Sequence, residues 1–597
     1  MENKCDQAKI LDIYLSLLIC ITNYQMRQKM KISSVKIYVL SLVLLLGACK
    51  SSYQPLSIPI TKDVKATKAM VISAHPFASQ IGLDVLKNGG NAVDAAIAVQ
   101  FALAVCYPAA GNIGGGGFMV LRDKNGNVKC LDFREKAPLA ATTNMYLDAN
   151  GDVIEDLSTT GHLAVGVPGV VDGMWQAFEQ YSKLKDWKAL IQPAIDGAKH
   201  GVILTEREAE GLNEVAKTFD LVNKRKSAFT TNPNWKVGDL LVQKELANTL
   251  KYVRDKGRAG FYEGKVANTL VKEMQKGNGL ITLKDLIAYK AVWREPISFT
   301  YKGYDVVSMP PPSSGGIALM QLMKMVEPYD LQSMGLHSTN STHLIVEAER
   351  RVYADRAAHL GDSDFYPVPI KTMTSEAYLK KRMSDFNPSM ATKSEQIKAG
   401  QIKESDQTTH FSIVDEEGNA VSITTTLNDG YGSKVIVEGG GYLLNNEMDD
   451  FSAKPGEPNL YGLIGAEANK VEPGKRMLSS MTPTIVSKNG KLKAVVGTPG
   501  GSTIITSVFQ TLLNIIDFEM NGFDAVAKPR FHHQWLPDLL YHERNCLDGQ
   551  VRIALTERGH ILSERGNIGR VEAIVFMPDG TISGGADPRG DDDAKGY

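Results

Sequence analysis

Two runs of strand-forming residues, joined by a short turn, constrain the fold of this 597-residue chain more than any other feature of its sequence. Residues 409–415 and 420–426 are rich in Thr, Ile, Val and Phe, which favour strands. Residues 416–419 between them form a turn of hairpin length that contains a glycine. The sequence therefore predicts an antiparallel hairpin whose first strand begins close to Thr408.

The register of this hairpin decides which side chains face Thr408. Pairing Asp415 with Ala420 places Thr408 opposite Leu427, to within about one register step. Polar residues then lie on either side of Leu427, and they are Thr426 and Asn428. Because threonine is itself a strand former, the spacing alone favours a purely structural role for this cluster.

The composition excludes several other kinds of protein. The 66 Lys and Arg residues balance 67 Asp and Glu residues, and the formal charge of −1 excludes a basic nucleic-acid-binding protein and an acidic disordered chain. Six cysteines in this length exclude a disulfide-built scaffold, and no pair of them has the spacing of a metal site. A chain of this length is expected to bury a large core, in one layered domain or in several units.

The first 49 residues differ in character from the rest. Lys31 and Lys36 precede a largely apolar run over 37–48, which is shorter than the ~20 helical residues that span a bilayer. A basic segment followed by a short apolar one is typical of an export signal. The run ends in a sequence that resembles a bacterial lipobox, which would make Cys49 the lipidated first residue of the mature protein. The alternative is an uncleaved anchor or an ordinary signal cut nearby.

The remaining N-terminal residues fit the same interpretation. A signal of normal shape begins at Met30, so residues 1–29 are an upstream extension or reflect a mis-assigned start. Residues 50–64 are predicted to form a flexible tether. We therefore expect an exported bacterial protein that faces the periplasm or is anchored to the outer membrane by lipid.

Two stretches further along the chain predict helices. Residues 91–105 are apolar nearly all round, which is typical of a buried helix, and Asn91 is a plausible N-cap. Residues 344–360 carry charges at i, i+4 spacing, which favours a solvated, ion-paired face. The charged residues of that face are Glu347, Glu349, Arg350, Arg351, Asp355 and Arg356. The glycines of 111–117 lack the sequence of a phosphate-binding loop and are expected to allow close backbone packing.

The segment that begins at Thr408 has counterparts in a known family. It reads Thr-Thr-His-Phe-Ser at 408–412, followed by Gly-Asn-Ala-Val at 418–421 and Thr-Thr-Thr-Leu-Asn at 424–428. This pattern resembles the signature of the γ-glutamyltranspeptidases. Other segments similar to blocks of that family follow in order over residues 65–597, and they are 89–96, 132–135, 311–316, 445–451, 478–481, 497–501, 529–533 and 586–589. So many blocks in one order make the resemblance very specific.

The resemblance implies a fold and a mode of maturation. Members are N-terminal-nucleophile hydrolases, so the expected fold class is α+β, a four-layer αββα sandwich with two antiparallel sheets. The hydroxyl of Thr408 would attack the carbonyl of Gln407, and water would split the resulting ester. The precursor would become a large subunit, 65–407, and a small subunit, 408–597. The α-amine freed on Thr408, with an ordinary pKa near ~7.7–8.0, would suit general-base chemistry at neutral pH.

The resemblance also implies the roles of the reacting groups. Mature Thr408 would attack the γ-glutamyl amide of glutathione or a related compound, and water or an amino-acid or peptide amine would resolve the ester. Thr426 would orient Thr408. The backbone N–H groups of Gly500 and Gly501 would form the oxyanion hole.

A γ-glutamyl group carries a free α-carboxylate and a free α-ammonium, so its pocket needs both signs of charge. By the same resemblance, Arg134 would bind the carboxylate through its guanidinium fork, and Asp450 would bind the ammonium. The other implied substrate-binding residues are Ser479 and Ser480 for the carboxylate, Asn428 and Glu447 for the ammonium, and Tyr461 in a lid-like loop over 452–465.

No metal, cofactor or nucleic acid is expected as a partner. The histidines His532, His533 and His542 lack zinc spacing, and structural roles are preferred for them and for the three aspartates of 591–593. At least one of Cys106, Cys130 and Cys546 is unpaired within the chain. The expected partners are a small-molecule substrate and the two subunits of one precursor, with the membrane contacted through the lipid anchor alone.

Two rival functions remain open from the sequence. The first is another enzyme of the same fold, a glutaryl-cephalosporin acylase or a poly-γ-glutamate depolymerase. Arg134 and Asp450 together argue for a free glutamyl α-carbon, which a glutaryl substrate lacks. The second rival is an unprocessed surface lipoprotein that only binds a ligand, and the presence of Thr408 and Thr426 argues against it.

Overall fold

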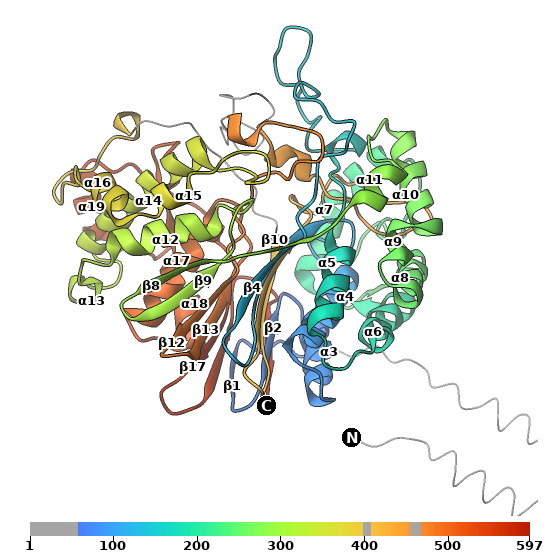
Figure 1. Cartoon of the computed structure of the whole chain (residues 1–597), viewed down its shortest axis with the longest axis horizontal. Coiled ribbons are helices and arrows are strands. Elements are labelled where there is room, and N and C mark those ends of the chain that lie inside the picture. Colours follow the sequence, from blue (N-terminus) through green and yellow to red (C-terminus); the bar gives the residue numbers. More distant parts are fainter. Residues whose placement is uncertain (1–57, 398–407, 453, 455–466) are drawn as a thin grey trace, which may run out of the picture. The chain divides into compact units, whose positions relative to one another are not determined.

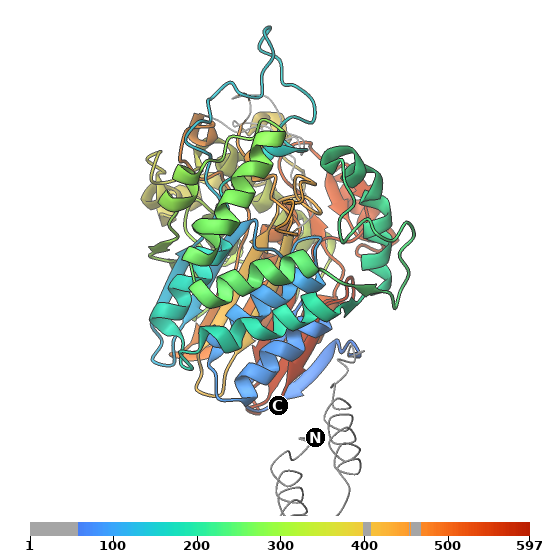
Figure 2. The ribbon, with the colours of Figure 1, turned by 90° about the vertical axis from the view of Figure 1, so that its right-hand side faces the viewer.

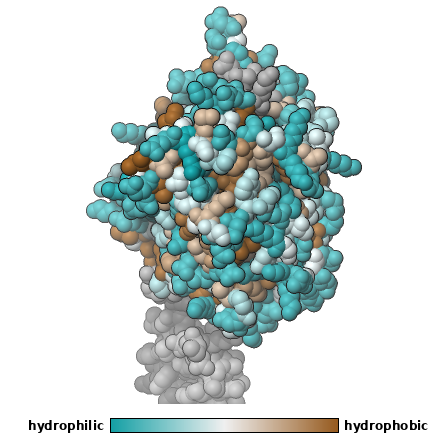
Figure 3. Space-filling model, turned by 90° about the vertical axis from the view of Figure 1, so that its left-hand side faces the viewer, coloured by the Kyte–Doolittle hydropathy of each residue, from teal (hydrophilic) through white to brown (hydrophobic). Residues whose placement is uncertain are grey.

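The computed structural model describes residues 58–397, 408–452, 454 and 467–597. The predicted extension, the signal and Cys49 lie outside these residues, as do Gln407 and Tyr461. Among the described helices, none has the length and apolar character needed to cross a membrane. On the face drawn in Figure 3, hydrophilic and hydrophobic residues are intermixed.

Two seven-stranded antiparallel sheets lie in the middle of the fold (Figure 1). In order, the strands of the first sheet are β1 (Asp63–Ala66), β18 (Ile582–Ala586), β17 (Glu572–Phe576), β13 (Lys491–Gly497), β12 (Thr484–Lys488), β9 (Tyr304–Ser308) and β8 (Ile297–Tyr301). Those of the second are β19 (Asp593–Gly596), β2 (Met70–Ser73), β10 (Thr408–Val414), β11 (Ala420–Thr426), β3 (Gly116–Arg122), β4 (Val128–Asp132) and β7 (Val292–Arg294).

Helices cover the outer face of each sheet. Over the second sheet, as Figure 2 shows, lie α3 (Pro76–Lys87), α4 (Ala92–Cys106), α5 (Val170–Tyr181), α6 (Trp187–His200), α8 (Lys244–Lys256), α9 (Ala259–Tyr262), α10 (Gly264–Lys276) and α11 (Leu283–Ala288). Over the first lie α12 (Gly315–Val326), α14 (Thr339–His359), α17 (Thr503–Ile516), α18 (Gly522–Ala527) and α19 (Gly549–Glu557).

The remaining elements are short or peripheral. They are α7 (Glu206–Asn223), α13 (Leu331–Met334), α15 (Ile370–Met373), α16 (Glu376–Arg382), the pair β5 (Val202–Ile203) and β6 (Leu240–Leu241), and the small sheet of β14 (Phe531–His532), β15 (Leu540–His542) and β16 (Leu562–Glu564).

Alternation along the strands separates three hydrophobic cores. In β3, Met119 and Leu121 pack against the helices, whereas Phe118 and Val120 pack against the other sheet. A third core lies between the first sheet and its helices. Three cores between four layers confirm the predicted αββα sandwich.

The predicted buried helix is confirmed as α4. All fifteen of its residues are buried. Asn91 is its N-cap: the Asn91 side chain accepts from the N–H of Asp94 at 2.9 Å, and the Asp94 carboxylate accepts from the N–H of Asn91 at 3.0 Å. This reciprocal capping satisfies two N–H groups that a buried helix end could not leave to water.

The prediction of a solvated face on α14 is wrong. Its six charged residues are at most 4% exposed. The i, i+4 pair of Glu347 and Arg351 does form, at 2.6 Å, but Arg351 also binds Asp385 at 2.7 Å and Arg350 binds Ser394 at 2.6 Å. The segments that cover the helix thus provide the partners of its charges, and i, i+4 spacing cannot distinguish such burial from exposure.

The prediction of a flexible tether over 50–64 is also wrong at its C-terminal end. Asp63 and Val64, assigned to it, form the first half of β1 and pair with β18 near the end of the chain. Lys62 just before them donates to the carbonyls of Asp587 and Gly590 at 3.0 and 2.9 Å. Polar composition suggested a linker, but backbone pairing across more than 500 residues orders these positions.

The segments before and after Thr408 are interleaved in both sheets. In the second sheet, β10 lies between β2 from the first segment and β11 from the second, and β11 pairs in turn with β3. In the first sheet, β12 pairs with β9 and β18 pairs with β1. A chain cut between the two segments would therefore remain one folded body.

Candidate active site

Thr408 is the first residue of β10, and it lies directly opposite Thr426 on β11. The predicted partner, Leu427, is wrong by one register step. The cause is Asp415, which leaves the strand: its carboxylate accepts from the N–H groups of Glu417 and Asn419 at 3.0 and 2.9 Å. This side-chain turn makes the loop one residue longer than the sequence suggested.

Thr408 lies on the side of its strand that faces the other sheet. His410, two residues further on, is 2.9 Å from Thr424 and packs against Gly497 of β13, where a Cβ would lie 2.2 Å from the imidazole. Burial lowers the pKa of His410 to about 3, so this histidine is neutral at physiological pH. Thr408 itself is 7% exposed.

Two cavities meet at Thr408. The larger has a volume of about 600 Å³ and is also lined by α7, by Gly500 and by residues near the end of the chain. The smaller has a volume of about 20 Å³, and its lining residues are Arg134, Thr408, Thr426, Asn428, Glu447, Asp450, Ser479, Ser480, Met481, Gly501 and Ile504. With the exception of Tyr461, which is not described, every residue predicted for the substrate pocket thus lies around one space.

Gly500 and Gly501 lie where the two cavities join. Gly500 lines the larger one and Gly501 the smaller one. Their φ angles are +134° and +55°, and their carbonyls accept from the N–H groups of Thr503 and Ile504 at 3.0 and 3.1 Å, at the start of α17. Positive φ at both positions explains why glycine stands there, and the N-terminus of α17 adds a positive partial charge.

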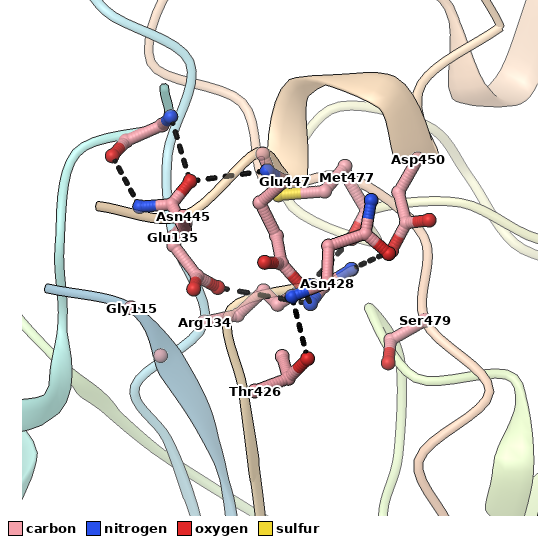
Figure 4. Close-up of polar contacts among 12 residues, drawn as sticks. Gly115, Arg134, Glu135, Thr426, Asn428, Asn445, Glu447, Asp450, Met477 and Ser479 are labelled. Carbon is pink, nitrogen blue, oxygen red and sulfur yellow. Dashed lines mark hydrogen bonds and ion pairs between the residues drawn. The ribbon is translucent and has the colours of Figure 1, made fainter. Parts of the chain in front are cut away.

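Arg134 lines the smaller cavity and lies close to Glu447, Asp450 and Asn428 (Figure 4). Its guanidinium forms ion pairs with Glu447 and with Asp450, and it donates to the carbonyl of Leu478 at 3.2 Å. The side chain of Arg134 is 1% exposed. The positive and negative groups that the resemblance assigns to one pocket do lie together, and here they bind each other.

A fourth charged residue in the same place, Glu135, belongs to the segment 132–135, and the sequence assigns it no role. Glu135 is fully buried, lies 3.7 Å from Arg134, and has no hydrogen-bond partner for either carboxylate oxygen among the described residues. Burial raises the pKa of Glu135 to about 7. Burial and the nearby charge of Glu135 together raise the pKa of Glu447 well above its ordinary value. In the sequence, the one sign that Glu135 belongs to the site is its position next to Arg134.

The end of β11 packs against the glycine-rich segment 111–117. Asn112 donates to the carbonyl of Thr426 at 2.8 Å, and a Cβ on Gly115 would lie 2.1 Å from the same oxygen. The Thr426 hydroxyl accepts from the N–H of Asn428 at 2.7 Å, and Asn428 adopts a φ of +74°. The prediction that this glycine-rich stretch serves close backbone packing is confirmed.

Ser479 and Ser480 are positioned by a residue that the sequence placed in solvent. Arg356 of α14 donates to Ser480 Oγ at 2.8 Å and to Ser314 Oγ at 2.9 Å. Ser314 in turn donates to the carbonyl of Ser479 at 2.7 Å. The buried helix α14 thereby supports one wall of the smaller cavity.

The predicted histidines have local partners. His532 lies 2.8 Å from Thr506 and 2.9 Å from Gln534, and the N–H of His533 donates to Glu349 at 2.9 Å. Of the described residues, one different group has metal-ligand spacing: His343, Glu347 and His560. Glu347 is already bound by Arg351, and His343 is 2.7 Å from His560. Cys106, Cys130 and Cys546 are all buried and free.

Comparison with known proteins agrees with this geometry. Residues 78–597 match the family described as gamma-glutamyltranspeptidase. The chain belongs to the γ-glutamyltranspeptidase family. Among family members, it is 45% identical to the glutathione hydrolase proenzyme of Escherichia coli (strain K12) over 570 residues, which cover 93% of this chain and 98% of that protein. It is 51% identical to the glutathione hydrolase proenzyme of Pseudomonas sp. (strain A14) over 478 residues, which cover 80% and 83%.

The fold is shared more widely than the family's name suggests. The crystal structure of cephalosporin acylase from Bacillus halodurans matches with a TM-score of 0.80 at 26% identity, covering 91% of this chain and 99% of that one. The predicted family and fold are therefore confirmed, and the fold alone does not distinguish the family's γ-glutamyl chemistry from the acylase rival.

Proposed function

We propose that this chain is a γ-glutamyl hydrolase and acyltransferase that uses Thr408 as its nucleophile. The observation that carries the proposal is the position of Thr408 at the junction of the two cavities, of which the smaller contains Arg134 and Asp450. A γ-glutamyl group in the smaller cavity presents its amide bond to Thr408, and the rest of the substrate extends into the larger one. Glutathione and related γ-glutamyl compounds fit this division.

The first chemical step forms an ester. Thr408 Oγ attacks the γ-carbonyl carbon, the carbon–nitrogen bond breaks, and the hydroxyl proton leaves on the nitrogen of the released amine. The α-amine of Thr408, once freed by maturation, takes and returns this proton, while Thr426 orients the nucleophile from the opposite strand. Water or a second amine then attacks the ester, and Thr408 recovers its proton.

The tetrahedral intermediates of both steps carry an oxyanion. The N–H groups of Gly500 and Gly501 would donate to it at the junction of the cavities, beside the start of α17. One such donor lowers the activation barrier by about 2.7–4 kcal/mol in other acyl-transfer enzymes.

Substrate selection would rest on an exchange of ion pairs. The substrate carboxylate replaces Glu447 and Asp450 on the guanidinium of Arg134, and its ammonium binds the carboxylates that are released, with Asn428 as a further partner. Ser479 and Ser480 complete the carboxylate site. A glutaryl group has no ammonium to offer. The displaced carboxylates, of which Glu447 is buried, would then lack that counter-charge, which is costly.

Maturation would create the nucleophile. The Thr408 hydroxyl attacks the carbonyl of Gln407, the acyl group moves from nitrogen to oxygen, and water hydrolyses the ester to give two subunits. The proenzyme names of the relatives support this step, and the interleaved strands would keep both subunits in one body. The mature chain would begin at Cys49, lipidated and periplasm-facing, and the tether would connect Cys49 to the large subunit. Mass spectrometry of the N-terminal peptide tests that assignment, which an unmodified peptide would refute.

The central experiment compares two substrates on purified protein. Both subunits are sequenced from a denaturing gel, and aniline release is measured from a γ-glutamyl anilide and from the matching glutaryl anilide. We expect a small subunit that begins at Thr408 and release from the γ-glutamyl compound alone. A preference for the glutaryl compound would favour an acylase, and an uncut, inactive chain would favour a binding lipoprotein.

A further inference from the structure

The larger cavity at Thr408 has a wall that the proposed chemistry does not yet use. Six residues of α7 line it. Five of them follow helical spacing, and they are Arg207, Glu210, Gly211, Glu214 and Val215; the sixth is the buried Glu208. The positions i, i+3, i+4, i+7 and i+8 form one face of a helix, so α7 presents to this cavity a face whose charged residues are Arg207, Glu210 and Glu214.

Four cationic side chains line this cavity, and they are not equally available. The Lys434 ammonium is held by Asp429 at 2.8 Å and by the carbonyls of Gly430 and Gly432. Arg589 is paired with Glu543 and with Asp587. Lys434 and Arg589 therefore already bind partners within the protein.

The other two, Arg207 and Arg570, differ from them. The Arg207 side chain is 55% exposed, and its contact to Asp591 is long, at 3.9 Å. Arg570 is 16% exposed; it donates through Nη1 to Tyr107 at 2.9 Å, lies over that ring, and is 3.6 Å from Asp592. The Nε and Nη2 groups of Arg570 have no hydrogen-bond partner among the described residues. One exposed and one largely buried guanidinium therefore line the same space.

We propose that Arg207, with Arg570 behind it, binds the carboxylate of the peptide or amino acid that leaves from, or attacks, the γ-glutamyl ester. This inference rests on the proposed function. The amine of such a ligand must reach Thr408, and its carboxylate then extends into the larger cavity, where a guanidinium is the matching partner. Glu210 and Glu214, on the same face of α7, would repel ligands that carry carboxylates elsewhere and so favour zwitterions.

The test measures transfer relative to hydrolysis on the mature enzyme. With a γ-glutamyl anilide as donor, glycylglycine and glycylglycinamide are compared as acceptors, because they differ in the terminal carboxylate. For each variant, the amount of each transfer product is divided by the amount of hydrolysis product. A general loss of activity lowers all three amounts and leaves these ratios unchanged. The variants are Arg207→Ala, Arg207→Lys and Arg207→Glu.

We expect Arg207→Ala to weaken the preference for glycylglycine over its amide by about fivefold, the upper range for a solvent-exposed charge pair. Arg207→Lys should lose less, and Arg207→Glu should reverse the preference. Lys217→Ala is the matched control, since Lys217 is exposed on the same helix about 15 Å along its axis and does not line the cavity.

The outcomes separate this inference from the function on which it rests. If the wild type releases no aniline, the proposed function fails and this inference fails with it. If the wild type is active and the acid-to-amide ratio is unchanged in Arg207→Ala and Arg207→Glu, the function stands and the role of Arg207 is refuted. A fall of the same size in Lys217→Ala would refute it as well.

Discussion

The two cavities that meet at Thr408 are built in opposite ways. The smaller is closed around Arg134, whose charge is already paired with Glu447 and Asp450 in the protein interior. The larger, about thirty times the volume, has an exposed guanidinium on Arg207 and exposed carboxylates on α7. Buried, preformed ion pairs make discrimination strict, because a wrong ligand leaves charges unpaired, whereas exposed charges contribute little and tolerate many ligands.

This contrast fits two-step acyl transfer. The donor group is the same in every reaction, while the leaving group and the acceptor vary. A strict site on one side of Thr408 and a permissive one on the other would give this combination of fixed acyl group and variable amine.

The largest loss of activity is expected from a change at Thr408, which lines both cavities. Thr408→Ala removes the hydroxyl, so neither autocleavage nor ester formation can occur, and activity should fall by more than about 10³-fold. A denaturing gel and aniline release measure the two effects. Thr408→Ser, which keeps a hydroxyl, should still be cut, and cleavage of the alanine variant would show that another group is the nucleophile.

Activity should be sensitive to a substitution in the smaller cavity even when the positive charge of Arg134 is kept. Arg134→Lys retains the cation but loses the planar fork and leaves one carboxylate without a partner, so kcat/KM for a γ-glutamyl anilide should fall about 100-fold. The effect exceeds the fivefold change expected at Arg207, and this difference is the measure of the contrast between the cavities. Equal losses at both positions would remove that contrast.

The backbone beneath the smaller cavity offers a third test. A Cβ on Gly115 would lie 2.1 Å from the carbonyl of Thr426, so Gly115→Ala should shift the end of β11 and lower the free energy of unfolding by about 1–3 kcal/mol. Urea unfolding measures it, and aniline release should fall in parallel. Gly566→Ala is the control, because a Cβ there meets nothing within 4 Å. Equal stability of the two variants would contradict the argument.

The last effect depends on pH. The pKa of Glu135 is raised to about 7 from an ordinary value of 4.5, so the folded state holds a proton that the unfolded chain releases. The stability that this provides is complete below about pH 4.5 and is lost as the pH rises through about 7. Glu135→Gln should therefore gain stability relative to the wild type over that interval in urea unfolding. A constant difference from pH 4.5 to 8 would refute this linkage.

The register of the hairpin shows how far local sequence reasoning reaches. Strand propensity identified both strands and the turn, because these depend on neighbouring residues. It missed the register by one step, since that depended on Asp415 binding N–H groups within the turn and the N–H of Ala92 at 2.8 Å. The contact with Ala92 comes from more than 300 residues away and cannot be derived from the hairpin itself.

The charges of α14 give the complementary lesson. Their spacing was read correctly, and the Glu347–Arg351 pair forms. Their burial was not predicted, because covering segments from elsewhere in the chain bring Asp385 and Ser394 to the two arginines. As a consequence Arg356, which holds Ser480, was missed as a support of the site.

The sequence by itself determined the family, because ordered motifs are local properties of the chain. Through that resemblance it also implied the sandwich and most of the residues that line the smaller cavity. The tertiary structure decided which charges bind each other. It paired Arg134 with Asp450, left Glu135 buried without a hydrogen-bond partner among the described residues, and opened a second cavity beside Thr408. Charge pairing and burial depend on what distant segments bring within a few ångströms, and that is set by how the four layers pack.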